Sequence, residues 1–169
     1  MQLQIIDKAL YRKRLNILIA INLVVLLVTS LSVSNIFIAF FGSAVDGDNF
    51  WWNVVGVLSG LIVMAGLSKF LVNKPFMAEI NYVRSLKREM NRIYRSSKKV
   101  QAGVDENNEV ALIITYFNLQ ASKQVYELDN NTLTMDELNE KIRLLDEKLK
   151  ELNMNVSVSN YRFELLSQL

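Results

Sequence analysis

The residues best suited to bind a ligand form a basic run in the middle of the chain. Between positions 84 and 99 the only acid is Glu89, and the basic residues there are Arg84, Lys87, Arg88, Arg92, Arg95, Lys98 and Lys99. Guanidinium and ammonium groups in such a run bind phosphate or carboxylate oxygens. We therefore expect an anionic lipid surface or an acidic partner here. The alternative is a solvated helix face whose charge only helps to fix membrane topology.

Groups for covalent or acid–base catalysis are scarce. The sequence has no Cys and no His, which excludes a thiolate nucleophile, a zinc–thiolate site and an imidazole base. The acid pairs Asp105-Glu106 and Asp136-Glu137 stand at the predicted starts of helices, where carboxylates complement the helix dipole. Glycine-rich phosphate loops and known hydrolase or calcium-binding spacings are also absent. We expect no enzymatic activity, no cofactor and no metal site.

Two long apolar runs are the elements that must position the basic run. Residues 15–41 contain no charged side chain, and residues 50–68 form a second uncharged run. A helix needs about 20 apolar residues to cross the bilayer core, and the first run exceeds the roughly 7–15 residues of a signal-peptide core. The short polar turn at 42–49 then predicts an antiparallel transmembrane hairpin with spans at about 15–41 and 51–72.

Basic residues flank the two runs and are absent from the turn, which carries Asp46 and Asp48. The flanking cations closest to the runs are Lys8, Arg12, Lys13, Arg14, Lys69 and Lys74. The positive-inside rule therefore places both termini in the cytoplasm and the turn outside. Trp51 and Trp52 are typical of an aromatic anchor at the outer interface, and Tyr11 is expected to act in the same way at the inner one.

Small residues predict how the two spans pack. Gly56 and Gly60 are four residues apart, as are Ser30 and Ser34, so each pair lies on one helix face and permits close backbone approach. In an antiparallel hairpin whose spans share the same interfaces, facing residue numbers sum to about 90. This places Gly60 opposite Ser30 and Gly56 opposite Ser34. The alternative is that the glycine face belongs to a contact between two copies of the chain.

The region after the hairpin is predicted to form a helical domain at residues 76–169, separate from the lead-in and hairpin at residues 1–75. Pro75 interrupts the helix, and apolar periodicity predicts helices at about 76–101 and 106–128, with Gly103 as the terminating glycine of the first. A third helix begins at Thr134, which is expected to form a capping box with Glu137. Leu133 and Leu138 would supply the hydrophobic staple around that box. The fold class is all-α, with about three helices after the hairpin.

The third helix carries an apolar seam with a four-three spacing, made of Leu138, Ile142, Leu145, Leu149 and Leu152. Such a seam forms either the core of a three-helix bundle or a short coiled coil with another copy or another protein. The acids of the same helix offer an internal counterpart for part of the basic run. From position 76 onward 13 basic residues stand against 14 acidic ones, a net charge of −1, which argues against nucleic acid as the principal partner.

Several short strings carry a family resemblance. They are Ile6-Asp7-Lys8 with Tyr11-Arg12-Lys13, Pro75-Phe76-Met77, Asn91-Arg92-Ile93-Tyr94 and Leu128-Asp129-Asn130-Asn131-Thr132-Leu133-Thr134. Together with the hairpin, these strings resemble domain-of-unknown-function family 3087, which consists of small two-span proteins of the bacterial inner membrane. The likeness covers roughly residues 1–145. It implies the topology and the location, and it brings no activity, cofactor or catalytic residue.

Two classes of function fit these features. The first is a non-enzymatic, membrane-anchored interaction or scaffold protein, whose cytoplasmic helices bind a protein partner or a second copy. The second is an accessory subunit of an oligomeric pore or transporter, in which neutral polar residues of the spans would line a path. The residues available for such a path are Asn22, Ser30, Ser34 and Asn35. Neither span contains an acid, a His or an Arg, so the usual parts of a proton relay are missing.

Overall fold

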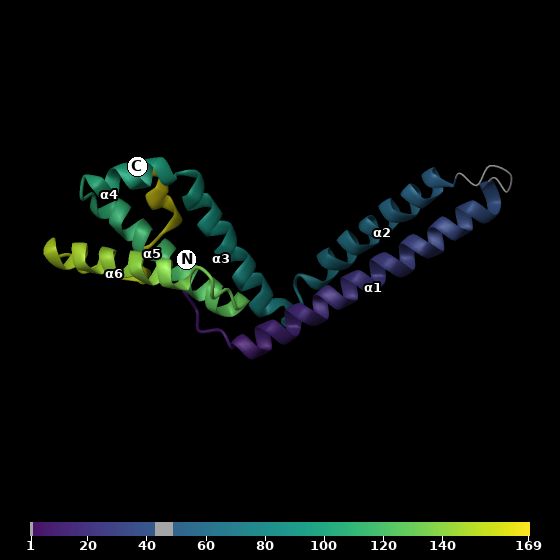
Figure 1. Ribbon diagram of the computed structural model, residues 1–169, viewed down its shortest axis with the longest axis horizontal. Helices are drawn as coiled ribbons and strands as arrows, with labels where there is room; N and C mark the ends of the chain where they lie inside the picture. The colour runs from purple at the N-terminus through teal and green to yellow at the C-terminus, as the bar shows by residue number, and fades with distance from the viewer. Residues whose placement is uncertain (1, 43–48) are drawn as a thin grey trace. The chain divides into compact units, whose positions relative to one another are not determined.

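The computed structural model describes residues 2–42 and 49–169 (Figure 1). Every regular element in these ranges is helical, which confirms the all-α fold class. The chain divides into two compact units, Lys13–Ile80 and Met1–Arg12 with Asn81–Leu169. Most of the predicted polar turn, including Asp46 and Asp48, lies outside the described residues.

The first unit is a hairpin of two long helices, α1 (Lys8–Phe41) and α2 (Phe50–Leu71). The helix α1 begins with a side-chain cap, because the backbone N–H of Leu10 donates to Asp7 Oδ1 at 3.0 Å. Both helices are long and apolar enough to cross a membrane. Their 34 and 22 residues correspond to about 51 Å and 33 Å of helix, compared with about 30 Å for a bilayer core.

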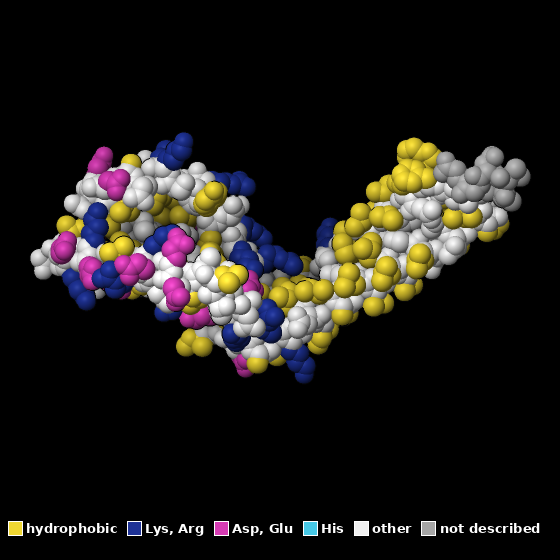
Figure 2. Space-filling view, in the orientation of Figure 1, with side chains coloured by type: hydrophobic (Ala, Val, Ile, Leu, Met, Phe, Trp, Pro, Cys, Tyr) yellow, Lys and Arg dark blue, Asp and Glu magenta, His cyan; other side chains and the backbone are white. Residues whose placement is uncertain are grey.

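Large apolar side chains cover the outside of this hairpin (Figure 2). Ile62 is 72% exposed, and only 11% of the most apolar window of each helix is buried within the protein. A helix at the core of a soluble domain would be mostly buried, whereas apolar surface on this scale marks a face that lipid or another protein covers.

The second unit is built around α5 (Glu109–Asp129), which packs against α4 (Ser97–Asp105) and α6 (Met135–Glu151). The helix α3 (Ala78–Arg95) follows a 3-10 turn at Pro75–Met77, where the proline ring fixes the break after α2. The core consists of fully or nearly fully buried side chains from α3, α4, α5 and the C-terminal segment. These are Leu86, Ile93, Val100, Ile114, Phe117, Ala121, Val125 and Tyr161.

The prediction of one long helix at 76–101 is wrong in detail, because the structure has two helices there, α3 and α4, separated at Ser96. Ser96 at the break is the residue before α4, with φ of −101° and ψ of 11°, and it makes no side-chain cap hydrogen bond. Four α-helices therefore follow the hairpin. The next helix, α5, starts at Glu109, where the Asn108 side chain accepts from the N–H groups of Val110 and Ala111.

Gly103 does not terminate a helix as predicted. It lies inside α4, where an added Cβ would come within 2.7 Å of the Ala111 Cβ, so it serves the close contact between α4 and α5. The left-handed residue after α4 is Asn107, with φ of 57°. Asparagine tolerates this conformation better than most residues because its short polar side chain bonds locally.

The capping box and staple predicted for α6 are also wrong. The helix does begin at Met135 with Thr134 as its N-cap residue, but no side-chain hydrogen bond caps it. Thr134 has φ of −109° and ψ of 7°, outside the extended region that an N-cap serine or threonine normally adopts. Leu133 is 96% exposed and so makes no staple with Leu138.

The N-terminal lead-in belongs structurally to the helical unit, which differs from the predicted division at position 75. The Tyr82 hydroxyl accepts from the Gln4 N–H and donates to Gln124 Oε1, both at 2.8 Å, and the Gln124 amide donates back to the Gln4 carbonyl. Tyr11, expected at a membrane interface, is only 2% exposed, and its hydroxyl donates to Asp129 Oδ1 at 3.0 Å. It therefore joins the start of α1 to the end of α5.

The C-terminal segment after α6 is fixed by Tyr161, between the two 3-10 helices Val158–Asn160 and Phe163–Ser167. Its ring stacks on Phe117 of α5 with centroids 4.0 Å apart, and its hydroxyl donates to Glu89 Oε1 of α3 at 2.6 Å. Burial, then the hydrogen bond to Glu89 and its negative charge, raise the pKa of Tyr161 above the ordinary phenol value. Tyr161 therefore connects α3 to α5 as a protonated donor.

Candidate interaction surface

The four residues predicted to pack the hairpin lie together between α1 and α2. A Cβ added at Gly56 would collide with the Ser30 carbonyl oxygen and approach the Ser34 Cβ to 2.9 Å. A Cβ at Gly60 would lie 2.5 Å from Ser30 Oγ. These two glycines thus face α1 of the same chain, so the surface they form is occupied within the monomer.

Two serine hydroxyls of the first span lie in the same contact. The Ser34 hydroxyl donates to Asn53 Oδ1, across from α1 to α2. Ser30 Oγ and Asn22 Oδ1 are buried and find no hydrogen-bond partner in the described ranges. Of the four residues proposed to line a path, Asn35 alone is classed as exposed.

The apolar seam of α6 lies against α5. Leu138, Leu145 and Leu149 are between 5% and 7% exposed, and the last two pack with Leu112. Ile142 and Leu152 are partly buried. The seam thus contributes to the core of the helical unit, the first of its two interpretations.

Three of the six acids of α6 are paired within their own helix. Glu137 binds Lys141 at 2.6 Å, and Arg143 binds both Glu140 and Glu147. The hydrogen bond from Lys141 lowers the pKa of Glu137. In the described part of the chain, the acids of α6 form no ion pair with the basic run.

All seven basic side chains of the run are exposed, but two of them are matched by an acid. Lys87 Nζ lies 2.5 Å from Asp129 Oδ2, at the end of α5. Arg92 Nη1 lies 3.1 Å from Glu89, which is itself only 8% exposed and also accepts from Tyr161. The single acid of the run is therefore used inside the fold.

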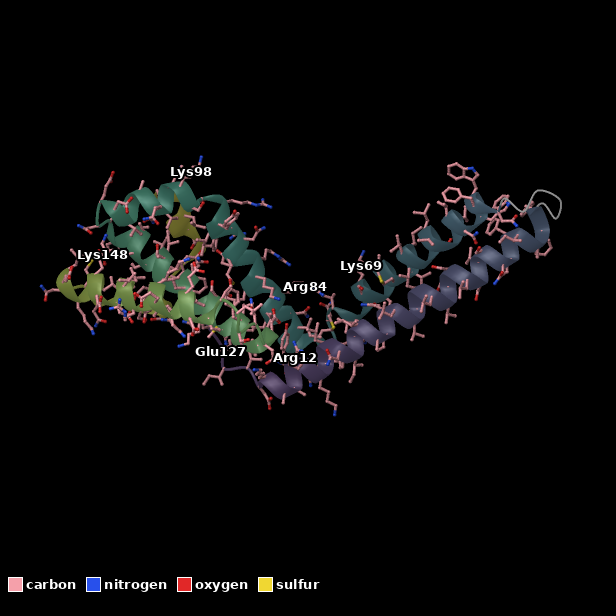
Figure 3. All side chains as sticks on the ribbon, viewed as in Figure 1. Arg12, Lys69, Arg84, Lys98, Glu127 and Lys148 are labelled. Carbon is pink, nitrogen blue, oxygen red and sulfur yellow. The ribbon has the colours of Figure 1, made fainter. Side chains whose placement is uncertain are left out.

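The other five cations have no carboxylate within 4.0 Å among the described residues, and we call them the basic stripe: Arg84, Arg88, Arg95, Lys98 and Lys99. At about 100° per residue, the three arginines and Asn91 fall within about 60° of one another on α3. Lys98 and Lys99 extend the stripe onto α4. Dark-blue side chains follow this edge in Figure 2, and Figure 3 labels Arg84 and Lys98 near the two ends of the stripe.

The exposed cations of the basic stripe can bind anions. No group of three or more carboxylates among the described residues could hold a metal ion. Of the buried titratable groups among the described residues, Glu89 and Tyr161 are bonded to each other, and Tyr11 donates to Asp129. What the surface does supply is unneutralised positive charge on a rigid helix.

Comparison with known proteins supplies a family. The model of the family described as "Protein of unknown function (DUF3087)" matches residues 1–166. The chain belongs to this family. The match confirms the resemblance in the sequence and extends it through the C-terminal segment that holds Tyr161. Searches of curated proteins and of solved structures returned no match.

The sequence alone did not identify the residues that bond to part of the basic run and leave the rest of it unpaired. One signal was visible, because Glu89 is the only acid among seven cations and a lone carboxylate there is suited to an internal role. Asp129 and Tyr161 gave no such signal. Both meet the run only through contacts that span 42 and 72 residues of sequence.

Proposed function

We propose that the protein is a membrane-anchored interaction protein of the bacterial inner membrane. In this proposal α1 and α2 anchor the chain, both termini lie in the cytoplasm, and the helical unit binds an acidic surface through the basic stripe. The observation that carries the proposal is that five exposed cations lack an acid partner while neighbouring cations have one.

The energetics support a binding role for the stripe. Internal ion pairs already use Lys87 and Arg92, so any further contribution of the stripe depends on an outside anion. Each basic residue near an anionic surface contributes about 1 kcal/mol at physiological ionic strength. Five such residues suffice for binding when the hairpin removes most of the cost of encounter.

The orientation rests on the flanking charges. Arg14 before the first span and Lys69 near the end of the second lie at the ends predicted to be cytoplasmic. A reporter enzyme fused after Leu169 should be active only in its cytoplasmic form. Activity of a periplasmic reporter at this position would contradict the proposed location of the helical unit.

The binding proposal is tested in native membranes with a photo-cross-linking side chain at position 91, on the face shared by the three arginines. A specific adduct is expected, and it should disappear when Arg84, Arg88 and Arg95 are all replaced by Gln. The matched control replaces Lys123, Lys141 and Lys150 by Gln, which removes the same charge elsewhere. The absence of any stripe-dependent adduct, whether protein or lipid, would contradict the proposal.

A second candidate is an accessory subunit of an oligomeric pore. It draws on Asn22 Oδ1 and Ser30 Oγ, which are buried without a hydrogen-bond partner among the described residues, as polar groups awaiting another contact would be. Against it, Ser34 and Ser30 lie in the contact between α1 and α2. Ion flux through vesicles containing confirmed oligomers would favour this candidate, and silent oligomers would rule it out.

A further inference from the structure

We infer that the basic stripe binds the phosphate groups of anionic phospholipids in the membrane that the hairpin spans. This inference rests on the proposed function and names the partner of the same surface. It commits to lipid, whereas an acidic protein becomes one outcome of the test below.

Chain connectivity gives the first argument. The helix α2 ends at Leu71, and Arg84 follows only 13 positions later, on the second turn of α3. A ligand that belongs to the bilayer is thus present within reach at all times, whereas a soluble partner must first be met. Charges attract over a Debye length of about 8 Å at physiological salt, so the stripe acts when α3 comes close to the membrane surface.

The residue types give the second argument. Three of the five cations are arginines, whose planar guanidinium groups bind phosphate oxygens through two parallel hydrogen bonds. Tyr94, beside them on α3, is 75% exposed. A tyrosine with an apolar ring and a polar tip is typical of the interface between lipid and water.

The distribution of charge gives the third argument. The stripe extends over about 16 Å from Arg84 to Arg95 and continues onto α4 beyond the break at Ser96, and such a series of cations suits a surface covered with repeated phosphates. Lys87 and Arg92 border it and are already paired with acids. The helix α6 carries six acids against four cations, so the unpaired positive charge of the helical unit is concentrated on α3 and α4, which favours their approach to an anionic surface.

The test uses the full-length protein in vesicles. Because the chain has no cysteine, Asn91→Cys gives a single site for a fluorescent probe at the centre of the stripe. Lipids with a nitroxide on the headgroup then quench the probe when α3 lies at the surface. Asn139→Cys, exposed on α6, provides the matched reference position.

Quenching at position 91 should be stronger in vesicles that contain phosphatidylglycerol than in vesicles of phosphatidylcholine alone, and position 139 should not show this difference. Replacing Arg84, Arg88 and Arg95 by Gln should lower the ratio of surface-bound to free helical unit by roughly 100-fold at low salt. Replacing Lys123, Lys141 and Lys150 by Gln should have a much smaller effect. Raising the salt from about 0.1 M to 1 M should release α3 of the parent protein from the membrane surface, because the Debye length falls from about 10 Å to 3 Å.

Equal quenching in neutral and anionic vesicles, or an unchanged signal in the triple arginine variant, would overturn the inference. If quenching is independent of anionic lipid while the cross-link at position 91 captures an acidic protein through the stripe, the lipid inference fails and the proposed function stands. If neither lipid nor protein contacts depend on the stripe, both fail. Membrane insertion serves as the folding control, since Lys8–Arg14 and Lys69 still fix the topology in every variant.

Discussion

The hairpin and the helical unit place large and small side chains in opposite ways. Where the backbones of α1 and α2 approach most closely the residues are glycine and serine, whereas many large apolar side chains of the two helices are exposed. In the helical unit Phe117 and Tyr161 are fully buried, and among its described charged side chains all except Glu89 are at least partly exposed. Apolar burial provides little drive between helices surrounded by lipid, so close approach of backbones replaces it. In water, burial of large side chains is the dominant favourable term.

Buried polar groups differ between the two units in the same way. The hairpin has one side-chain hydrogen bond across its contact, from Ser34 to Asn53, and leaves Ser30 Oγ without a partner among the described residues. The helical unit surrounds Glu89 with donors from Tyr161 and Arg92. A buried carboxylate without donors is costly, and this one joins α3 to the C-terminal segment. The comparison predicts that single changes are most damaging in the helical unit.

The largest effect is expected from Tyr161→Ala. This change removes the ring that stacks on Phe117 and the donor to Glu89, so the helical unit should lose about 3–5 kcal/mol. Hydrogen exchange at the amides of α5 should rise accordingly. The fluorescence of Trp51 and Trp52, both in α2, should not change, because it reports the hairpin. An equal loss in both units would show that they unfold together and would break the comparison.

Tyr161→Phe should have a smaller effect, because it keeps the ring and removes only the hydroxyl that donates to Glu89. A hydrogen bond to a charged group contributes about 1.5–3 kcal/mol. The folded-state pKa of Tyr161 is raised, so its contribution is complete below the unfolded value of 10.0 and is lost as the pH rises through the folded value. The parent should therefore lose stability more steeply than the variant above about pH 10. Parallel curves for the two proteins would contradict this assignment.

The three glycines of α2 test the hairpin side of the comparison. Gly56→Ala should be the most damaging, at about 1–3 kcal/mol, because its Cβ would meet the Ser30 backbone, which cannot move alone. Gly60→Ala should be milder, since the nearest atoms belong to the Ser30 and Leu26 side chains. Gly66→Ala should be neutral, because no atom lies within 4 Å of its Cβ. Helix association in detergent, measured by cysteine cross-linking between positions 34 and 53, which are in contact across the hairpin, should follow this order; an effect at Gly66 equal to that at Gly56 would refute it.

The elements that could be predicted from sequence are those fixed by composition over many residues. Two uncharged runs determine two long apolar helices, and apolar periodicity determines the helices that follow. The position of Gly60 next to Ser30 and of Gly56 next to Ser34 also corresponds to simple antiparallel geometry. In each case many residues together determine the position of a helix or the pairing of two helices, so a single residue does not change the result.

The features that could not be predicted depend on single residues and distant contacts. The break at Ser96 and the role of Gly103 depend on the packing of α4 against α5. Thr134 has a side chain that could cap α6, but its backbone conformation does not allow the capping hydrogen bond. The basic run is visible in the sequence, but its division into paired and unpaired cations needs Asp129, which is 42 residues from Lys87. The number of charges can be counted in the sequence, whereas which charges remain unpaired depends on contacts made in the fold.

The smallest effects are expected at the two hairpin serines, and their sign tests the account of polar groups between the spans. Ser34→Ala removes a donor to Asn53 and should cost about 0.6 kcal/mol, the average for a hydrogen bond between membrane helices. Ser30→Ala removes a hydroxyl that has no hydrogen-bond partner among the described residues, so it should be neutral or slightly stabilising. Reversible unfolding of the hairpin in mixed micelles, followed by Trp51 and Trp52 fluorescence, resolves the two. A clear loss with Ser30→Ala would mean that its hydroxyl is bonded in the membrane, either across the contact or to another copy, and would move support towards the oligomeric pore.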